Sequence, residues 1–311
     1  MWDFASIVER TRKAAASVSQ LEAALSRDPN SAAIQINLAA SKKRAIQANN
    51  ELQEIAKYNR VDICHYRLLP IHHRGFALGS VSKSLLEYQL FFSQIYDSIK
   101  NGAKTRAQIG KEAAEDSALE LAYTYSGSLG VVLAARNERD FFEGKLDPAI
   151  DALYSIMDVD SPSAIRDVAV IYGGAVIKRL HDWSRANVAG EYSADLRWDR
   201  SDGRHLGGVY EIDRLERLAN LATASSDKTT DTNTHTGVLV GGDLNGETFH
   251  FVVPNGPDFR GTLAEEFPSD TEMILGKTYT ATIRETTTTV YATEKVERQR
   301  ELLFLSQRTA I

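Results

Sequence analysis

The chain has 311 residues, 43% hydrophobic and 25% charged, which is enough for about two domains with ordinary hydrophobic cores. A net charge of −6 argues against a generally basic surface, and the one cysteine, Cys64, excludes an intrachain disulfide. No apolar run approaches the roughly 18 residues that span a bilayer, and the first residues lead into an amphipathic pattern rather than a signal peptide, so we expect a cytoplasmic protein with no membrane partner.

Two apolar seams dominate residues 1–60. Within each, apolar or small residues recur at alternating steps of three and four, and the turn-forming stretch Asp28-Pro29-Asn30-Ser31 separates them. This heptad spacing predicts an antiparallel helical coiled-coil hairpin, which is typical of an interaction device rather than a reaction centre. The seam residues expected to make these contacts are Phe4, Ile7, Val18, Leu21, Leu25, Ile34, Leu38, Leu52 and Ile55.

The predicted hairpin is mildly basic, whereas the rest of the chain is acidic. Residues 1–60 hold nine Lys and Arg against six Asp and Glu, while residues 231–311 hold seven against 12. A solvated helix face is the simpler interpretation of this positive charge, and a nucleic-acid surface is the alternative. The residues that motivate the alternative are Arg10, Arg12, Lys13, Lys42, Lys43 and Arg44.

Residues 61–224 alternate strand and helix signals and are expected to form an α+β domain with about four strands. The predicted strands are 61–69, 119–125, 129–135 and 194–198, and the main predicted helices are 80–102, 147–157 and 161–186. Gly173-Gly174 inside the last helix lowers its helix propensity, which indicates that another backbone approaches closely there.

The remainder of the chain changes in composition and in hydrophobic period. Residues 225–234 are rich in Ser, Thr and Asp and are expected to form a linker. Six segments of period two follow, and they predict a small SH3-like or OB-like β-barrel over residues 235–311. Phe249, Phe251, Phe259 and Tyr279 of this barrel could stack on bases, but the barrel is acidic and alternation favours core positions for several of the phenylalanines.

Three stretches, taken with this order of hairpin, α+β domain and barrel, resemble a family of uncharacterised bacterial proteins. They are Ala-Leu-Gly-Ser-Val-Ser-Lys-Ser-Leu at 77–85, Tyr-Ser-Gly-Ser-Leu-Gly-Val-Val-Leu at 125–133 and Tyr-Ala-Thr-Glu-Lys at 291–295. The resemblance implies a bacterial host. It carries over no activity and no site residue.

The sequence does not predict a metal centre or a cofactor site. Cys64 and His65 would point to opposite faces of a strand, and His72-His73 adds no second pair of the kind that a four-ligand zinc site needs. Asp195 and Asp199 would share one strand face about 13 Å apart, which is too far for one metal ion. We expect instead that they belong to a polar outer face.

A few residues of the α+β segment are candidates for catalysis. Asp140-Phe-Phe-Glu143-Gly-Lys145 contains the Glu-x-Lys element of a metal-dependent nuclease class, although a charged loop is the simpler interpretation. His181 and Asp182 lie near the end of a predicted helix, where basic neighbours complement the helix dipole. If the protein is an enzyme, Glu143, Lys145, His181 and Asp182 are the residues to test.

No motif specifies a reaction, so the catalytic residues stay unknown at this stage. The uninterrupted heptads favour a non-enzymatic adaptor or regulatory subunit that binds a protein partner or a second copy of itself. Two alternatives stay open. One is a nucleic-acid-binding protein that uses the basic hairpin, and the other is an enzyme of unknown reaction with its site in the α+β segment.

Overall fold

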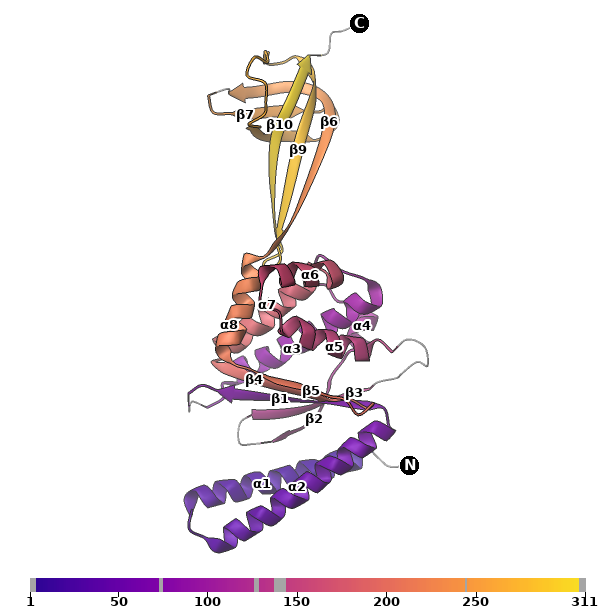
Figure 1. Cartoon of the computed structure of the whole chain (residues 1–311), viewed down its shortest axis with the longest axis vertical. Coiled ribbons are helices and arrows are strands. Elements are labelled where there is room, and N and C mark those ends of the chain that lie inside the picture. The colour runs from indigo at the N-terminus through magenta and orange to yellow at the C-terminus, as the bar shows by residue number, and fades with distance from the viewer. Residues whose placement is uncertain (1–3, 73–74, 126–128, 137–143, 244, 308–311) are drawn as a thin grey trace. The chain divides into compact units, whose positions relative to one another are not determined.

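The computed structural model describes residues 4–72, 75–125, 129–136, 144–243 and 245–307. The fold is α+β, and its contacts divide the chain into two units, Met1–Ser225 and Ser226–Ile311 (Figure 1). The first unit holds a five-stranded sheet flanked by helices, and the second holds a closed barrel. Among the helices in the described ranges, none is long and apolar enough to cross a membrane.

The sheet of the first unit has the order β2-β3-β1-β4-β5, and every neighbouring pair is antiparallel. Its strands are β1 (Val61–Pro70), β2 (Glu120–Tyr125), β3 (Leu129–Arg136), β4 (Tyr192–Asp199) and β5 (His205–Tyr210). About four strands were expected. The extra strand, β5, carries Gly207-Gly208, which interrupts the apolar alternation that would have identified it.

Helices lie on both faces of this sheet. One face carries α1 (Phe4–Arg27) and α2 (Ala32–Tyr58), and the other helices lie on the opposite side (Figure 1). Those helices are α3 (Leu78–Asn101), α4 (Lys111–Asp116), α5 (Leu146–Met157), α6 (Pro162–Tyr172), α7 (Gly174–Ala189) and α8 (Ile212–Ala224).

Alternation along β1 sends one set of side chains into the core beneath α3 and α7. The Tyr66 hydroxyl donates to Asn187 Oδ1 at 3.1 Å and accepts from Trp183 Nε1 at 3.0 Å. Cys64 is fully buried on the same side, and its Sγ lies 3.4 Å from the Tyr88 hydroxyl. Burial raises the pKa of the Cys64 thiol to about 12. As the alternation predicted, Cys64 and His65 face opposite sides of the sheet.

The segment expected to form one helix over 161–186 instead forms α6 and α7, which meet at Gly173. This glycine has φ +90°, a left-handed conformation that ends a helix. A Cβ on Gly173 would collide with the backbone of Lys104, and the Ala175 N–H donates to the Lys104 carbonyl at 3.0 Å. The prediction of a close backbone approach is therefore confirmed, and the prediction of a continuous helix is wrong.

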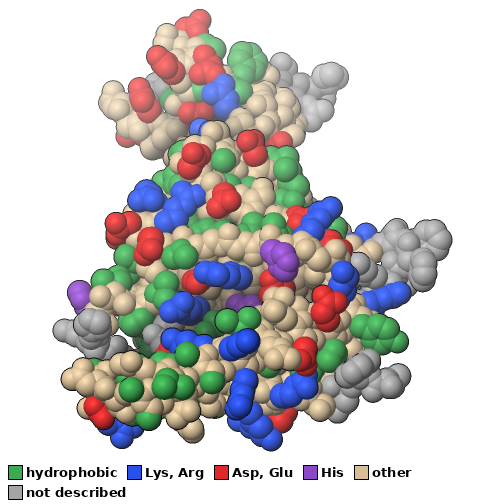
Figure 2. Space-filling model, turned by 60° about the horizontal axis from the view of Figure 1, so that its bottom comes forward, with side chains coloured by type: hydrophobic (Ala, Val, Ile, Leu, Met, Phe, Trp, Pro, Cys, Tyr) green, Lys and Arg blue, Asp and Glu red, His purple; other side chains and the backbone are tan. Residues whose placement is uncertain are grey.

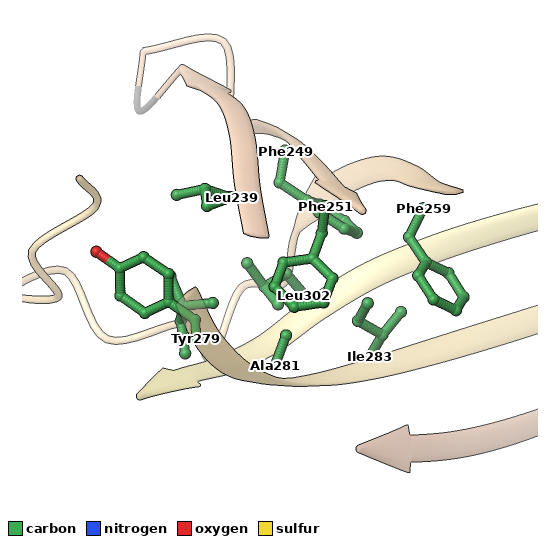
Figure 3. Close-up of a cluster of buried hydrophobic side chains, with 9 residues drawn as sticks. Leu239, Phe249, Phe251, Phe259, Tyr279, Ala281, Ile283 and Leu302 are labelled. Atoms are coloured by element: carbon green, nitrogen blue, oxygen red, sulfur yellow. The ribbon is translucent and has the colours of Figure 1, made fainter. Parts of the chain in front are cut away.

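The second unit is a closed barrel with the strand order β10-β8-β7-β6-β9. The pair β10 and β8 is parallel, and the other pairs are antiparallel. Phe249, Phe251, Phe259 and Tyr279 are buried in its core together with Ala281, Ile283 and Leu302 (Figure 3). The alternation predicted core positions for several of these phenylalanines. The strands are β6 (Ser226–Asp243), β7 (Thr248–Val252), β8 (Asp258–Leu263), β9 (Thr278–Val290) and β10 (Lys295–Gln307).

Residues 226–234, expected to be part of a linker, form the first half of β6 instead. They pair with β9 from Ser226 opposite Val290 to Thr234 opposite Thr282. Threonine favours strands, but the side chains of residues 227–234 are exposed on both faces of the ribbon. No apolar alternation therefore marks this strand in the sequence. Likewise β9 unites two of the six expected segments, so the barrel has five strands.

Candidate functional site

Polar contacts join α1 and α2 along their length. Thr11 Oγ1 donates to the carbonyl of Ala48 at 3.2 Å, and Lys42 Nζ lies 2.9 Å from Glu22 Oε1. Arg10 pairs with Glu51. Each contact joins an early residue of α1 to a late residue of α2 or the reverse, so the two helices run side by side in opposite directions (Figure 1).

The predicted seam residues differ in burial. Ile7, Leu38 and Leu52 are buried, whereas the other six are half-buried: Phe4, Val18, Leu21, Leu25, Ile34 and Ile55. On α2, Ile36 and Ile46 lie outside the seam and are 69% and 63% exposed. The described part of the helix pair therefore keeps apolar surface in contact with solvent.

The helix pair packs on the sheet through the end that lies farthest from its turn. There, a buried cluster joins α1 and α2 to β1, β2 and β3; it consists of Ile7, Leu52, Ala56, Val61, Ile63, Tyr123, Val132 and Ala134. Beside this cluster the helices and the sheet enclose a cleft (the α/β cleft). Figure 2 shows a hollow between these layers, with Lys, Arg and His side chains around it.

The floor of the α/β cleft comes from the sheet face opposite the Cys64 core. In the register of β1 and β4, His65 lies opposite Arg197 and Arg67 lies opposite Asp195. A cavity of about 330 Å³ opens above them. Every side chain of its lining carries a polar group: Asn49 and Gln53 from α2, Tyr125 from β2, and His65, Arg67, Asp195, Arg197 and Asp199.

Asp199 is the centre of a hydrogen-bonded cluster in this cleft. Its Oδ2 accepts from Gln53 Nε2 at 2.8 Å and lies 3.4 Å from His65 Nε2, while its Oδ1 lies 2.7 Å from His205 Nδ1. Burial would raise the pKa of Asp199, but the hydrogen bonds from His65, His205 and Gln53 outweigh it and lower that pKa to about 2. The carboxylate thus ties α2 to β1 and β5.

Asp195 and Tyr125 are also fixed by their neighbours. Arg197 donates to both carboxylate oxygens of Asp195, at 3.0 and 3.2 Å. The ring of Tyr125 lies across Gly130, where a Cβ would collide with it. Because β3 has no side chain at this position, the tyrosine can reach over β3 and line the cleft above β1.

A second cavity, of about 340 Å³, adjoins the polar one and shares Asn49, His65 and Tyr125 with it. Apolar and small side chains of the helix pair make up most of its remaining lining. These are Thr11, Ala15, Val18, Ser19, Ala45 and Ile46, joined by Lys42 and by Tyr123 from the sheet. The α/β cleft therefore has a polar half and an apolar half.

Of the candidates for catalysis named from the sequence, Lys145, His181 and Asp182 do not line this cleft. Glu143 and His73 lie outside the described residues, and His72 is exposed. His181 Nδ1 lies 3.1 Å from Asp182 Oδ1 on α7, on the other side of the sheet. Lys145 immediately precedes α5. Within the described ranges no group of three or more His, Cys, Asp and Glu is arranged to hold a metal ion. The expectation of no metal and no cofactor stays a prediction.

Alternation predicted a polar outer face that carries Asp195 and Asp199. The structure has the polar face, but Asp195 is buried in it, and the face forms the floor of the cleft instead of an outer surface. The same alternation at His65 and Arg67 was the available signal for the other half of the floor. No local pattern indicated Gln53, which is 146 residues from its partner Asp199.

Comparisons with known proteins returned no match: no family model fits the sequence, and no curated protein or solved structure is similar to it. The resemblance described from the sequence stays a prediction.

Proposed function

We propose that the chain is a non-enzymatic cytoplasmic adaptor or regulatory subunit that acts through protein–protein interaction. The coiled-coil hairpin of α1 and α2 is its main binding surface. The barrel, which has the size of an SH3-like or OB-like domain, is a second binding module. The first partner of the hairpin is the hairpin of a second copy, so that two hairpins form a four-helix bundle.

The observation that carries this proposal is the incomplete burial of the seam. Leu21, Leu25 and Ile34, near the turn, are only half-buried in a single chain, and Ile36 on α2 is 69% exposed. A pair of helices covers only one side of each apolar stripe, whereas a bundle covers more. Burying an isoleucine fully contributes about 1.5–3 kcal/mol, so a few such side chains favour association.

The test is the mass of the full-length protein in solution. We expect a dimer by light scattering across a dilution series, and Ile36→Gln should weaken the dimer about tenfold, as the loss of about 1.4 kcal/mol of apolar burial requires. Val170→Gln is the matched control, because Val170 is 80% exposed on α6. A wild-type monomer at every concentration, or equal weakening by both variants, would contradict the proposal.

The nucleic-acid alternative is less well supported by the charges on the hairpin. Arg10 pairs with Glu51, Arg12 and Lys13 with Glu9, and Lys42 with Glu22. Those carboxylates reduce the positive field that a phosphate backbone would need. Binding of a labelled oligonucleotide that weakens steeply with added salt would favour this alternative.

One observation favours the enzyme alternative. His65 lines a cavity and lies next to Asp199, which is the arrangement of a general base and the group that orients it. In that case His65, rather than the candidates named from the sequence, carries the proton transfer. Hydrolysis of nitrophenyl ester or phosphodiester substrates that is lost in His65→Gln and retained in His72→Gln would support it.

A further inference from the structure

The two halves of the α/β cleft differ in chemistry, and a single small molecule could fill both. We propose that the cleft binds a small organic anion. Its phosphate or carboxylate group lies against Arg67 and Arg197, and its apolar, ring-sized body lies against Val18, Ile46 and Tyr123. This ligand site is distinct from the outer hairpin surface and does not depend on self-association.

The acidic groups of the polar half are already hydrogen-bonded within the protein. Arg197 bonds to both oxygens of Asp195, and Gln53 and His205 bond to the two oxygens of Asp199. An anion entering the cavity therefore meets carboxylates whose oxygens already accept hydrogen bonds from the protein. The same lining also carries guanidinium, amide and hydroxyl donors from Arg67, Arg197, Asn49 and Tyr125.

The floor of the polar half supplies several hydrogen-bond donors. The Arg197 guanidinium uses its Nε and one Nη for Asp195, and a guanidinium carries more N–H groups than one carboxylate can accept. Arg67, diagonal to Arg197 in the β1–β4 register, supplies a second guanidinium. The Asn49 amide and the Tyr125 hydroxyl line the same cavity. Guanidinium groups suit phosphates and carboxylates because they can bind both oxygens at once.

The volume and lining of the apolar half suit a ring-sized group. It has about 340 Å³ and adjoins the polar cavity at His65 and Tyr125, so one ligand can extend from one half to the other. Each half lies at the lower end of the volumes typical of small-molecule sites, about 300–1,000 Å³. The rings of Tyr123, Tyr125 and His65 favour a planar body, because aromatic faces pack against rings in offset or tilted arrangements.

Hydrogen bonds hold the roof of the site in place. Gln53 ties α2 to Asp199 with a 2.8 Å hydrogen bond, and Thr11 ties α1 to the Ala48 carbonyl. The cleft therefore exists before a ligand enters. A pre-formed site loses less conformational entropy on binding than one that must be assembled.

The test compares matched charged and neutral ligands on the full-length wild-type protein by calorimetry. Adenosine 5′-monophosphate is paired with adenosine, and indole-3-acetate is paired with indole-3-acetamide; inorganic phosphate tests the anion without a ring. We expect one of the two organic anions to bind at least about tenfold more tightly than its own neutral partner. It should also bind at least about tenfold more tightly than inorganic phosphate. The pair that responds identifies the anion as phosphate or carboxylate.

Two variants then locate the binding. The first variant is Arg67→Gln. The second combines Arg197→Gln with Asp195→Asn, so that the Asp195 carboxylate is not left without its partner. Each variant should weaken the affinity for the organic anion about tenfold or more. Arg166→Gln removes an exposed arginine of α6 and should leave the affinity unchanged. Circular dichroism of each variant verifies that it is folded.

Three results would overturn the proposal. The first is that neither anion binds more tightly than its neutral partner. The second is that inorganic phosphate binds as tightly as the organic anion, which would make the ring irrelevant. The third is that the arginine variants and Arg166→Gln bind equally well. If a variant fails to fold, the comparison of charged and neutral ligands on the wild-type protein still decides whether the cleft binds an anion. The mass of the protein in solution tests the adaptor proposal separately.

Discussion

Asp199 shows how single residues build this site. It is the last residue of β4, and its two oxygens reach groups from α2, β1 and β5. A carboxylate with this many partners is stabilised in its charged form, which is why its pKa is about 2 despite partial burial. The same contacts make the folded state sensitive to acid.

We predict that Asp199 makes the protein less stable in acid. Its pKa is lower in the folded state than its usual 3.8, so its contribution is complete above about pH 5 and is lost as the pH falls towards 2. The full contribution is about 2 kcal/mol, of which about 1 kcal/mol is lost between about pH 6 and about pH 3. Urea unfolding at these two pH values measures this loss, which should be smaller in Asp199→Asn.

Asp160→Asn is the control for this experiment, because Asp160 is exposed. It should keep the acid sensitivity of the wild type. If Asp199→Asn also loses as much stability as the wild type between the two pH values, the carboxylate does not hold the cleft together in the way described.

At the scale of elements, Gly173 determines where α6 ends and α7 begins. Its φ of +90° disfavours any residue with a Cβ, and the Lys104 backbone occupies the space where that Cβ would lie. Gly203, in the turn between β4 and β5, has φ +89° but no atom within 4 Å of the corresponding position. Comparing alanine substitutions at the two glycines therefore separates the cost of backbone strain from the cost of steric overlap.

We predict that Gly173→Ala destabilises the protein more than Gly203→Ala does. The left-handed conformation alone costs about 1–2 kcal/mol with a Cβ, and overlap in a packed site adds about 1–3 kcal/mol. Gly203→Ala should therefore lose about 1–2 kcal/mol of unfolding free energy and Gly173→Ala about 3 kcal/mol or more, measured by urea unfolding. Equal losses would mean that the Lys104 backbone can move aside.

The elements differ in how well sequence patterns could predict them. Strong periodicity predicted the helices of residues 1–60, the strands β1, β3 and β4, and core positions for several phenylalanines of the barrel. The first half of β6 was missed because its side chains are polar on both faces, so no period distinguishes it from a linker. The roof of the cleft could not be predicted, because the contact of Gln53 with Asp199 depends on tertiary packing.

At the scale of the molecule, the chain has two units with separate hydrophobic cores. The barrel core contains Phe251 and Tyr279, whereas Trp183 and Trp198 lie in the core of the first unit. The third tryptophan of the sequence, Trp2, also precedes Ser226. Tryptophan fluorescence thus reports on the first unit alone.

We predict that Phe251→Ala destabilises the barrel and leaves the first unit nearly unchanged. Phe251 is fully buried in the barrel core, and replacing a buried phenylalanine with alanine costs about 3–5 kcal/mol of unfolding free energy. Far-ultraviolet circular dichroism should show an earlier barrel transition, while the tryptophan fluorescence transition stays at the wild-type denaturant concentration. Leu275→Ala, at a position 55% exposed, is the control that should shift neither. A fluorescence transition that moves with the barrel would show that the units unfold together.

The isolation of Cys64 has a practical consequence. This sole thiol sits on the central strand β1, next in sequence to a cleft residue, and burial keeps it in the protonated form that does not attack alkylating reagents. Iodoacetamide can modify it only when the middle of the sheet opens. The rate of alkylation, measured by mass spectrometry without an engineered label, therefore reports how often that strand opens. Any molecule that binds in the neighbouring cleft and holds it closed should slow this rate.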